Sequence, residues 1–290
     1  MKKYLKLIRV KHWLKNGLVF LPIFFSINIL NKEYFLTTLI AFFVFSLSSS
    51  IVYVINDIND VEKDRKHPIK KNRPLASGAI SIKNAYITIF VISMLALTMM
   101  SVIYTNTKNI YTIIVPLIYI VMNILYSKWL KHVPIIDVVI IVLGFLLRVM
   151  YGGLAVNVEV SKWLYLMIIF GSFYLGFGKR RNEIIKNGEK SRKVLELYNK
   201  DFLDKNMYVA LTLAVVSYTL WCVDPTTVAR IGNDYMFWTI PILIIILQLY
   251  SLNIEGNSHG DPIEVILSDR VLVATIILFV IVMIGLLYIL

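Results

Sequence analysis

Cysteine is almost absent from this sequence. Cys222 is the single thiol among 290 residues, and it lies in an apolar run. One thiol cannot form a disulfide framework, and it excludes the zinc and iron–sulfur sites that depend on several cysteines. The four histidines show no spacing typical of metal ligands, and no low-complexity tract or Gly/Ser linker divides the chain. We therefore expect no redox chemistry and one domain, residues 1–290.

Charge is also scarce, because Asp, Glu, Lys and Arg make up only 17% of the residues. Hydrophobic residues make up 58% and the mean hydropathy is +0.72, whereas soluble domains have roughly 45 to 50% apolar residues. The membrane bilayer is therefore the expected surroundings of this chain. A net charge of +12 is also found in nucleic-acid binders, but the basic residues of membrane proteins usually fix topology. We expect no nucleic-acid partner.

Long apolar runs indicate membrane-spanning helices. A helix needs about 17 to 25 residues to cross a hydrocarbon core of ~30 Å. Nine runs approach or reach that length, so the sequence predicts an all-α integral membrane protein with a bundle of about nine transmembrane helices. The runs are residues 17–31, 35–55, 85–104, 110–126, 134–156, 163–178, 206–223, 235–252 and 271–289.

The distribution of Lys and Arg predicts the orientation of the bundle. If the N-terminus is cytoplasmic, the cytoplasmic segments hold 25 of the 30 basic residues and the opposite side holds four. Basic residues near helix ends favour the cytoplasm. We predict a cytoplasmic N-terminus, an external C-terminus and a location in the inner, cytoplasmic membrane. The two long cytoplasmic loops, 56–84 and 179–205, are where we expect a functional site that faces the cytoplasm.

The second span ends in an N-D-x-x-D-x-x-x-D pattern formed by Asn56, Asp57, Asp60 and Asp64. On a continuing helix the three acids share one face, so we expect their carboxylates to converge at the membrane surface. A cation relieves their mutual repulsion, and such hard oxygen ligands suit Mg²⁺, which also binds diphosphates. We predict that the three aspartates bind the metal. The alternative is a solvated polar helix end.

Cations follow this acidic pattern at once. Lys70 and Arg73 lie in a loop where His67-Pro68, Arg73-Pro74 and Gly78 predict fixed turns. Metal-bound acids that face cations can hold a polyanionic substrate from both sides. The residues therefore predict a magnesium-dependent diphosphate site.

The stretch from Asn56 to Gly78, N-D-x-x-D-x-x-x-D-x-x-H-P-x-K-x-x-R-P-x-A-x-G, resembles the UbiA superfamily of intramembrane prenyltransferases. It is similar in particular to one branch, the decaprenyl-phosphate phosphoribosyltransferases. The resemblance implies nine transmembrane helices around a central cavity, which we expect to open to the cytoplasmic side. Supporting matches extend over nearly the whole chain: Trp13-x-Lys15-Asn16, Tyr126-Ser127-x-x-Leu130-Lys131, Gly144-Phe145-x-x-Arg148, Gly178-Lys179-Arg180-x-x-Glu183, Arg192-x-Val194-Leu195-x-x-Tyr198 and Asp261-Pro262-x-Glu264.

The branch implies transfer of a 5-phosphoribosyl group from phosphoribosyl pyrophosphate to a polyprenyl phosphate, with diphosphate released and Mg²⁺ as cofactor. The typical superfamily member carries a second D-x-x-x-D motif after the sixth span. This chain has Gly178-Lys179-Arg180-Arg181-Asn182-Glu183 there, with three cations and one acid. Replacing metal-binding carboxylates by cations removes one metal site and creates a phosphate site.

Two alternative functions stay open. A UbiA-type enzyme could move a prenyl group from a prenyl diphosphate to an aromatic acceptor, but the missing second acidic motif disfavours it. A transporter would have charges along a pathway at mid-depth, whereas here the acids cluster at one surface and Arg148 is the one charge deep in a span. The sequence predicts neither the polyprenyl chain length nor the oligomeric state.

The charges and the resemblance together assign candidate roles. Asn56, Asp57 and Asp60 are the expected catalytic residues, with Asn56 orienting the acids by hydrogen bonds. Phosphate is already an anionic nucleophile, so positioning and electrostatics are expected to supply most of the rate without a general base. The candidate substrate-binding residues are Lys15, Asn16, Lys70, Arg73, Tyr126, Lys131, Arg148, Lys179, Arg180, Glu183 and Tyr198.

Arg148 is the candidate with the most open interpretation. A charge at the centre of a membrane helix costs at least ~2.5 to 3.5 kcal/mol, so we expect it to face the bundle interior and to have a partner. Asp137 is one candidate, on the same face but three turns away and too far for a direct pair. Contact with substrate, snorkelling to a headgroup and a structural pair all remain open.

Overall fold

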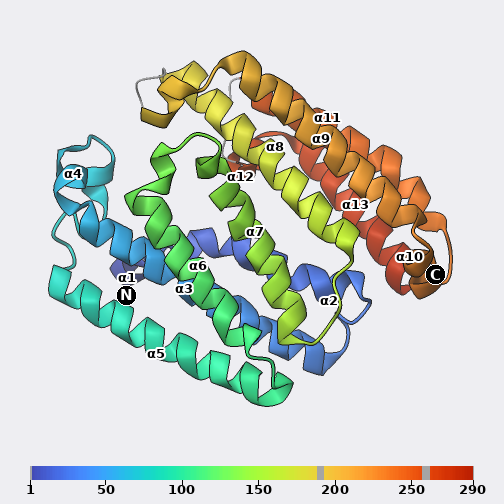
Figure 1. Ribbon diagram of the computed structural model, residues 1–290, viewed down its shortest axis with the longest axis horizontal. Coiled ribbons are helices and arrows are strands. Elements are labelled where there is room, and N and C mark those ends of the chain that lie inside the picture. Colours follow the sequence, from blue (N-terminus) through green and yellow to red (C-terminus); the bar gives the residue numbers. More distant parts are fainter. Residues whose placement is uncertain (1, 188–192, 257–261, 290) are drawn as a thin grey trace. The chain divides into compact units, whose positions relative to one another are not determined.

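The computed structural model describes residues 2–187, 193–256 and 262–289, and every regular element in these ranges is a helix (Figure 1). The all-α prediction is thus confirmed. Arg192 and Asp261, which belong to the resemblance, lie outside the described residues. The elements are α1 Lys2–Leu7, η1 Val10–Phe20, α2 Leu21–Phe25, α3 Lys32–Asn59, α4 Val61–Lys66, η2 Lys70–Asn72, α5 Ile82–Thr107, α6 Tyr111–Lys128, η3 Leu130–His132, α7 Ile136–Ala155, α8 Lys162–Asn187, η5 Lys193–Leu197, α9 Lys200–Val223, α10 Pro225–Ile231, η6 Tyr235–Thr239, α11 Ile240–Glu255, α12 Pro262–Ser268 and α13 Arg270–Tyr288.

Seven segments of the described chain are long and apolar enough to cross a membrane. They are α3, α5, α6, α7, α9, the stretch Tyr235–Glu255 and α13, and each coincides with one of the nine predicted spans. The predicted span 163–178 lies inside α8, which is long but carries charged residues toward its end. The number nine stays a prediction.

The predicted first span, 17–31, is not one long helix. Its residues fall in the 3-10 helix η1 and the short α-helix α2, and Ile27 then takes a positive φ of 61°. Pro22 lies in the first turn of α2, where its missing N–H costs no hydrogen bond. In η1 the buried Asn16 side chain donates hydrogen bonds to the Ser46 and Ser49 hydroxyls of α3.

The contacts group the described residues into two compact units. Unit 1 contains residues 1–129 and 147–159, and unit 2 contains residues 130–146 and 160–290. Helix α7 contributes its first part to unit 2 and its second part to unit 1. The expectation of one domain over residues 1–290 stays a prediction.

Helix α3 is the centre of unit 1. About two thirds of its span, 67%, is buried, compared with 22% for the spans of α5 and α6, which both pack against it. Figure 1 shows α5 running alongside α3. Small residues on α3 allow close approach: Ser50 accepts a hydrogen bond from Trp13 and donates one to the Ile8 carbonyl. The N-terminal segment is thereby fastened to the last turns of α3.

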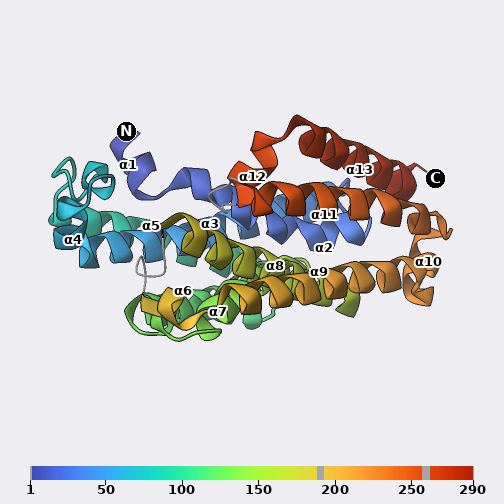
Figure 2. The ribbon, with the colours of Figure 1, turned by 90° about the horizontal axis from the view of Figure 1, so that it is seen from above.

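Unit 2 is built around the pair α8 and α9, with α11 beside α9 and α13 beside α11 (Figures 1 and 2). Its apolar core includes Phe177, Leu203, Met207 and Ile254. Gly178 lies where a Cβ would come within 2.6 Å of the Ile254 side chain, so glycine permits the close packing of α8 against α11. This packing holds the end of α8, which carries the basic segment 178–183 that replaces the second acidic motif.

Candidate functional site

The acidic motif lies where α3 ends and α4 begins. Helix α3 stops at Asn59, Asp60 takes φ −98° and ψ 7°, and α4 starts at Val61. The expectation of a continuing helix is therefore wrong, because Asp60 interrupts the helix. The backbone nevertheless keeps its helical spacing, because the Asp60 amide donates to the Asn56 carbonyl at 3.0 Å and the Asp64 amide to the Asp60 carbonyl at 2.8 Å.

Two of the three aspartates converge on one arginine. Asp57 and Asp64 are each 3% exposed. Arg73 donates from Nη1 to Asp64 Oδ2 at 2.6 Å and to Asp57 Oδ1 at 3.2 Å. A guanidinium between two buried carboxylates neutralises the charge that would otherwise drive them apart. Asn56, by contrast, is only half-buried at this helix end.

Asp60 does not share this arrangement. Its side chain is 40% exposed and lies 4.0 Å from Lys63. In the part of the chain that the structure describes, no group of three His, Cys, Asp or Glu side chains is placed to hold a metal ion. The predicted convergence of three carboxylates is therefore not found, because Asp57 and Asp64 are drawn to Arg73 while Asp60 sits at the helix junction.

Arg9 also belongs to this cluster, although the sequence analysis did not identify it as a site residue. It donates from Nη2 to Asp57 Oδ1 at 2.6 Å, and its guanidinium lies 4.6 Å from the centre of the Tyr53 ring. Its backbone is left-handed, with φ 52°, between α1 and η1. In the sequence Arg9 is one of six basic residues that all fit a topology signal, and only its planar guanidinium set it apart from the lysines.

The loop after α4 holds Arg73 through turns of the predicted kind. The His67 ring accepts hydrogen bonds at Nδ1 from the amides of Ile69 and Lys70 at 3.2 and 3.3 Å. The Ile80 amide donates to the Pro74 carbonyl, and Gly78 has a φ of 75°, which suits glycine. The Lys70 side chain is exposed. Arg73 is thus fixed in place, whereas Lys70 faces solvent.

Arg148 is buried inside unit 1, as predicted, with 7% of its surface exposed. It donates from Nε to Asn16 Oδ1 at 2.8 Å and from Nη2 to the Tyr119 hydroxyl at 3.1 Å. Its guanidinium carbon also lies 5.0 Å from the ring centres of Phe45 and Tyr119. Snorkelling to a headgroup is therefore wrong. Substrate contact by Arg148 and Asn16 stays a prediction.

A second buried cluster forms in unit 2 around Asp137, which is fully buried. Arg180 donates from Nε to Asp137 Oδ2 at 2.6 Å and from Nη1 to Glu183 Oε2 at 2.9 Å. The Tyr198 hydroxyl donates to Asp137 Oδ1 at 2.6 Å. The structure thus joins three predicted substrate-binding residues around an aspartate that the sequence offered only as a partner for Arg148. That interpretation of Asp137 is wrong, because its partners are Arg180 and Tyr198.

The Tyr198 hydroxyl is held in its protonated, donating form in this cluster. Burial, together with the hydrogen bond to Asp137, raises the pKa of its hydroxyl above the usual range. The same oxygen accepts a hydrogen bond from the Ile135 amide at 2.6 Å. Tyr198 therefore stays protonated at neutral pH and ties η5 to the start of α7.

The cations of the second motif have different surroundings. Arg180 is 1% exposed, and Arg181 is 8% exposed and donates to Asp204 at 2.5 Å. Both guanidinium groups thus have carboxylate partners within unit 2. Lys179 is half-buried on the same helix. Among the other predicted residues, Lys15, Tyr126 and Lys131 are also half-buried, in η1, α6 and η3.

Comparison with known proteins agrees with this architecture. The UbiA prenyltransferase family matches residues 19–265. A decaprenyl-phosphate phosphoribosyltransferase from Corynebacterium glutamicum is 36% identical, over 92% of this chain and 81% of that protein. The protein of the same name from Mycolicibacterium smegmatis is 34% identical, over 92% of this chain and 87% of its own length.

A solved structure shares the fold. A UbiA homolog from Archaeoglobus fulgidus bound to GPP and Mg²⁺ aligns with a TM-score of 0.70 at 18% identity, over 98% of this chain and 99% of that one. With seven segments long and apolar enough to span a bilayer in its described part, this chain is a multi-pass membrane protein. It belongs to the UbiA prenyltransferase family.

Proposed function

We propose that this chain transfers a 5-phosphoribosyl group from phosphoribosyl pyrophosphate to a polyprenyl phosphate and releases diphosphate. The relatives at 33 to 36% identity that carry the name decaprenyl-phosphate phosphoribosyltransferase support this reaction. The structural observation that carries it is the Arg180 cluster. Where a second acidic metal motif would bind a prenyl diphosphate, this chain has a buried guanidinium already held by Asp137 and Glu183.

The donor diphosphate is proposed to bind at the acidic motif of unit 1. The oxygen donors there fit Mg²⁺, because this ion typically takes one or two carboxylates and completes its shell with water and substrate phosphates. Asp57 and Asp64 would hold it, with Asp60 at the junction as a further ligand and Asn56 orienting the group. Bound Mg²⁺ would neutralise charge on the leaving diphosphate.

Arg9 and Arg73 are proposed to change partners when the donor binds. Both pair with Asp57 in this structure, at 2.6 and 3.2 Å. A carboxylate that ligates a metal no longer needs a guanidinium, and guanidinium groups suit phosphate oxygens by their paired N–H donors. Arg9 and Arg73 would then turn to the diphosphate, with the exposed Lys70 as an additional contact.

The transfer itself needs few protein groups. The bond from C1 of the ribose to the diphosphate oxygen breaks, its electron pair leaves with diphosphate, and a polyprenyl phosphate oxygen forms the new bond to C1. The acceptor is anionic, so no general base is required, and binding and orientation supply the rate. Lys15, Lys131, Lys179 and Tyr126 are the proposed contacts for the acceptor phosphate or the 5-phosphate of the sugar.

The buried cluster around Asp137 is proposed to fix the basic segment 178–183 in place. It contains Arg180, Glu183 and Tyr198. Because Arg180 is almost fully buried and has two carboxylate partners, its proposed contribution is to hold the end of α8. Besides their predicted contact with substrate, Arg148 and Asn16 are proposed to fix η1 and with it Lys15, the residue before Asn16. The basic residues further support an inner-membrane location with this chemistry on the cytoplasmic face.

The reaction can be tested by offering the purified, detergent-solubilised protein two substrate pairs. One pair is phosphoribosyl pyrophosphate with a polyprenyl phosphate, and the other is a prenyl diphosphate with an aromatic acid. We expect a phosphoribosylated lipid from the first pair and no product from the second. Product from the second pair alone would contradict the proposal and identify a prenyltransferase.

A further inference from the structure

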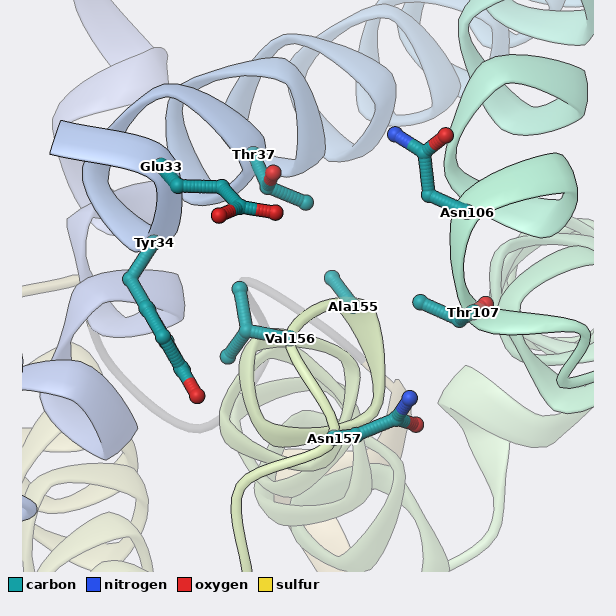
Figure 3. Close-up of a pocket in the computed structure, with 8 residues that line it drawn as sticks. All are labelled: Glu33, Tyr34, Thr37, Asn106, Thr107, Ala155, Val156 and Asn157. Carbon is teal, nitrogen blue, oxygen red and sulfur yellow. The ribbon is translucent and has the colours of Figure 1, made fainter.

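A polar cavity lies at the end of unit 1 that is remote from the acidic motif. It has a volume of about 190 Å³ and is lined by Glu33, Tyr34 and Thr37 of α3, Asn106 and Thr107 of α5, and residues 155–157 at the end of α7. Figure 3 shows these side chains arranged around a common space. Pockets for drug-sized ligands measure roughly 300 to 1,000 Å³, so this one suits a small group.

The cavity is separate from the proposed active site. Glu33 and Asp57 lie 24 positions apart on the same helix, α3, which at ~1.5 Å per residue places them about 36 Å apart along its axis. That length exceeds the ~30 Å hydrocarbon core. The cavity therefore opens at the membrane surface opposite the acidic motif.

Three polar side chains of the cavity have no partner within the described residues, whereas the Thr107 hydroxyl donates to the Ile103 carbonyl. Within the described ranges, the side chains of Glu33, Asn106 and Asn157 make no hydrogen bond or ion pair with another residue. In Figure 3 the Glu33 carboxylate extends from α3 into the shared space, and Asn106 faces it from α5. One negative charge, amide oxygens and hydroxyl groups thus line a single small space.

We propose that this cavity binds a primary ammonium group, as carried by the headgroup of an ethanolamine lipid. An ammonium has three donors and no acceptor, which matches a carboxylate surrounded by amide and hydroxyl oxygens. Its single positive charge matches the single charge of Glu33. Because the cavity lies at a membrane surface, lipid headgroups are next to it, at the ends of the spanning helices.

The residues beside the cavity suit the rest of such a headgroup. Lys32 precedes Glu33 and Lys108 follows Thr107, and both lysines are exposed. An ethanolamine headgroup carries its phosphate next to the ammonium, and lysine is a common phosphate partner. A zwitterionic headgroup therefore matches both charges at this place, whereas an anionic glycerol headgroup would bring no positive group to Glu33.

The test is native mass spectrometry of the full-length protein in detergent. Phosphatidylethanolamine and phosphatidylglycerol with identical acyl chains are titrated separately onto wild type, Glu33→Gln and Glu159→Gln. Glu159 is the matched control, since it is exposed near the same end of α7 but does not line the cavity. Asn106→Leu, which removes a neutral acceptor, serves as a second variant of the cavity.

We expect Glu33→Gln to weaken binding of phosphatidylethanolamine about tenfold, the loss of one charge-assisted hydrogen bond, with phosphatidylglycerol unaffected. Asn106→Leu should weaken the same lipid less, and Glu159→Gln should match wild type. Equal binding of phosphatidylethanolamine by wild type and Glu33→Gln, or equal affinity of wild type for both lipids, would overturn the proposal.

A competition arm distinguishes the two sources of an ammonium group. Free ethanolamine is added to wild type loaded with phosphatidylethanolamine. Retention of the lipid at a tenfold excess of the amine assigns the site to the headgroup. Displacement at equal concentration assigns it to a soluble amine, still bound through Glu33. The readout is lipid or amine mass, so failure of the proposed phosphoribosyl transfer leaves this test unchanged.

Discussion

Arginine is the residue that organises the buried polar parts of this molecule. Arg73 joins two carboxylates, Arg148 joins an amide to a phenol, and Arg180 joins two more carboxylates. Each guanidinium offers five N–H donors in one plane, so a single side chain can satisfy several buried acceptors. Replacing any of them leaves acceptors without donors in surroundings where water is scarce.

Arg148→Met tests this at mid-membrane. The apolar side chain leaves Asn16 Oδ1 and the Tyr119 hydroxyl without their shared donor, so we expect the free energy of unfolding to fall by about 2 to 4 kcal/mol. Equilibrium unfolding in mixed micelles measures the change. Arg65→Met is the control, because Arg65 is an exposed partner of Glu62 and should change stability by under ~1 kcal/mol. Equal losses in both variants would contradict a structural role for Arg148.

Tyr198 gives a prediction on pH. Its pKa is raised in the folded protein, so the fold favours the protonated hydroxyl. That contribution is fully present below the pKa of an unfolded tyrosine, about 10, and is lost as pH rises through the folded pKa. We expect Tyr198→Phe to be less stable than wild type at pH 7, with the difference shrinking above pH 10. Thermal unfolding at pH 7 and at pH 10.5 checks this, and a difference that grows with pH would contradict it.

At the same scale, the sequence identified some of these side chains and not others. The spacing of the acidic residues singled out Asp57 and Asp64. The position of a charge within a predicted span singled out Arg148. Arg9 was hidden among basic residues that equally explain topology, and its approach to Asp57 depends on a left-handed turn between α1 and η1. Such a contact between segments 48 positions apart cannot be read from local spacing.

At the scale of elements, apolar length predicted the long helices well and failed at a segment with unusual winding. Seven predicted spans coincide with long apolar helical segments. Residues 17–31 were apolar enough to suggest another, but hydropathy is blind to the 3-10 winding of η1. The interruption at Asp60 was not predicted either. The spacing of the acidic residues fits a helix whether or not one residue leaves the helical conformation.

Gly152→Ala tests the packing of η1 against α7. A Cβ at Gly152 would lie 2.0 Å from the Val19 carbonyl oxygen, a backbone atom that cannot turn aside. We expect a loss of about 1 to 3 kcal/mol in the free energy of unfolding, the usual cost of overpacking. Gly171→Ala on α8 is the matched control, since nothing lies within 4 Å of its Cβ position. A stable Gly152→Ala protein would show that η1 lies elsewhere.

At the scale of the whole molecule, the charge distribution predicts which side of the membrane each loop faces. The single native thiol, Cys222, is buried and can be replaced by serine to give a background without cysteine. We expect Lys71→Cys to react with a membrane-impermeant maleimide only after the cells are opened, and Lys108→Cys to react in intact cells, because these exposed residues belong to opposite loops. Labelling of Lys71→Cys in intact cells would contradict the predicted orientation.

The central claim is that this chain moves phosphoribose with the buried acids Asp57 and Asp64. The most direct measurement is transfer of radiolabelled phosphoribose to a polyprenyl phosphate by purified wild type, Asp57→Asn and the control Glu62→Gln, with Mg²⁺ or with chelator. Glu62 is an exposed acid of the same motif region. We expect labelled lipid from wild type and Glu62→Gln with Mg²⁺, at least ~100-fold less from Asp57→Asn, and none with chelator. Equal transfer by wild type and Asp57→Asn, or undiminished transfer with chelator, would contradict the account.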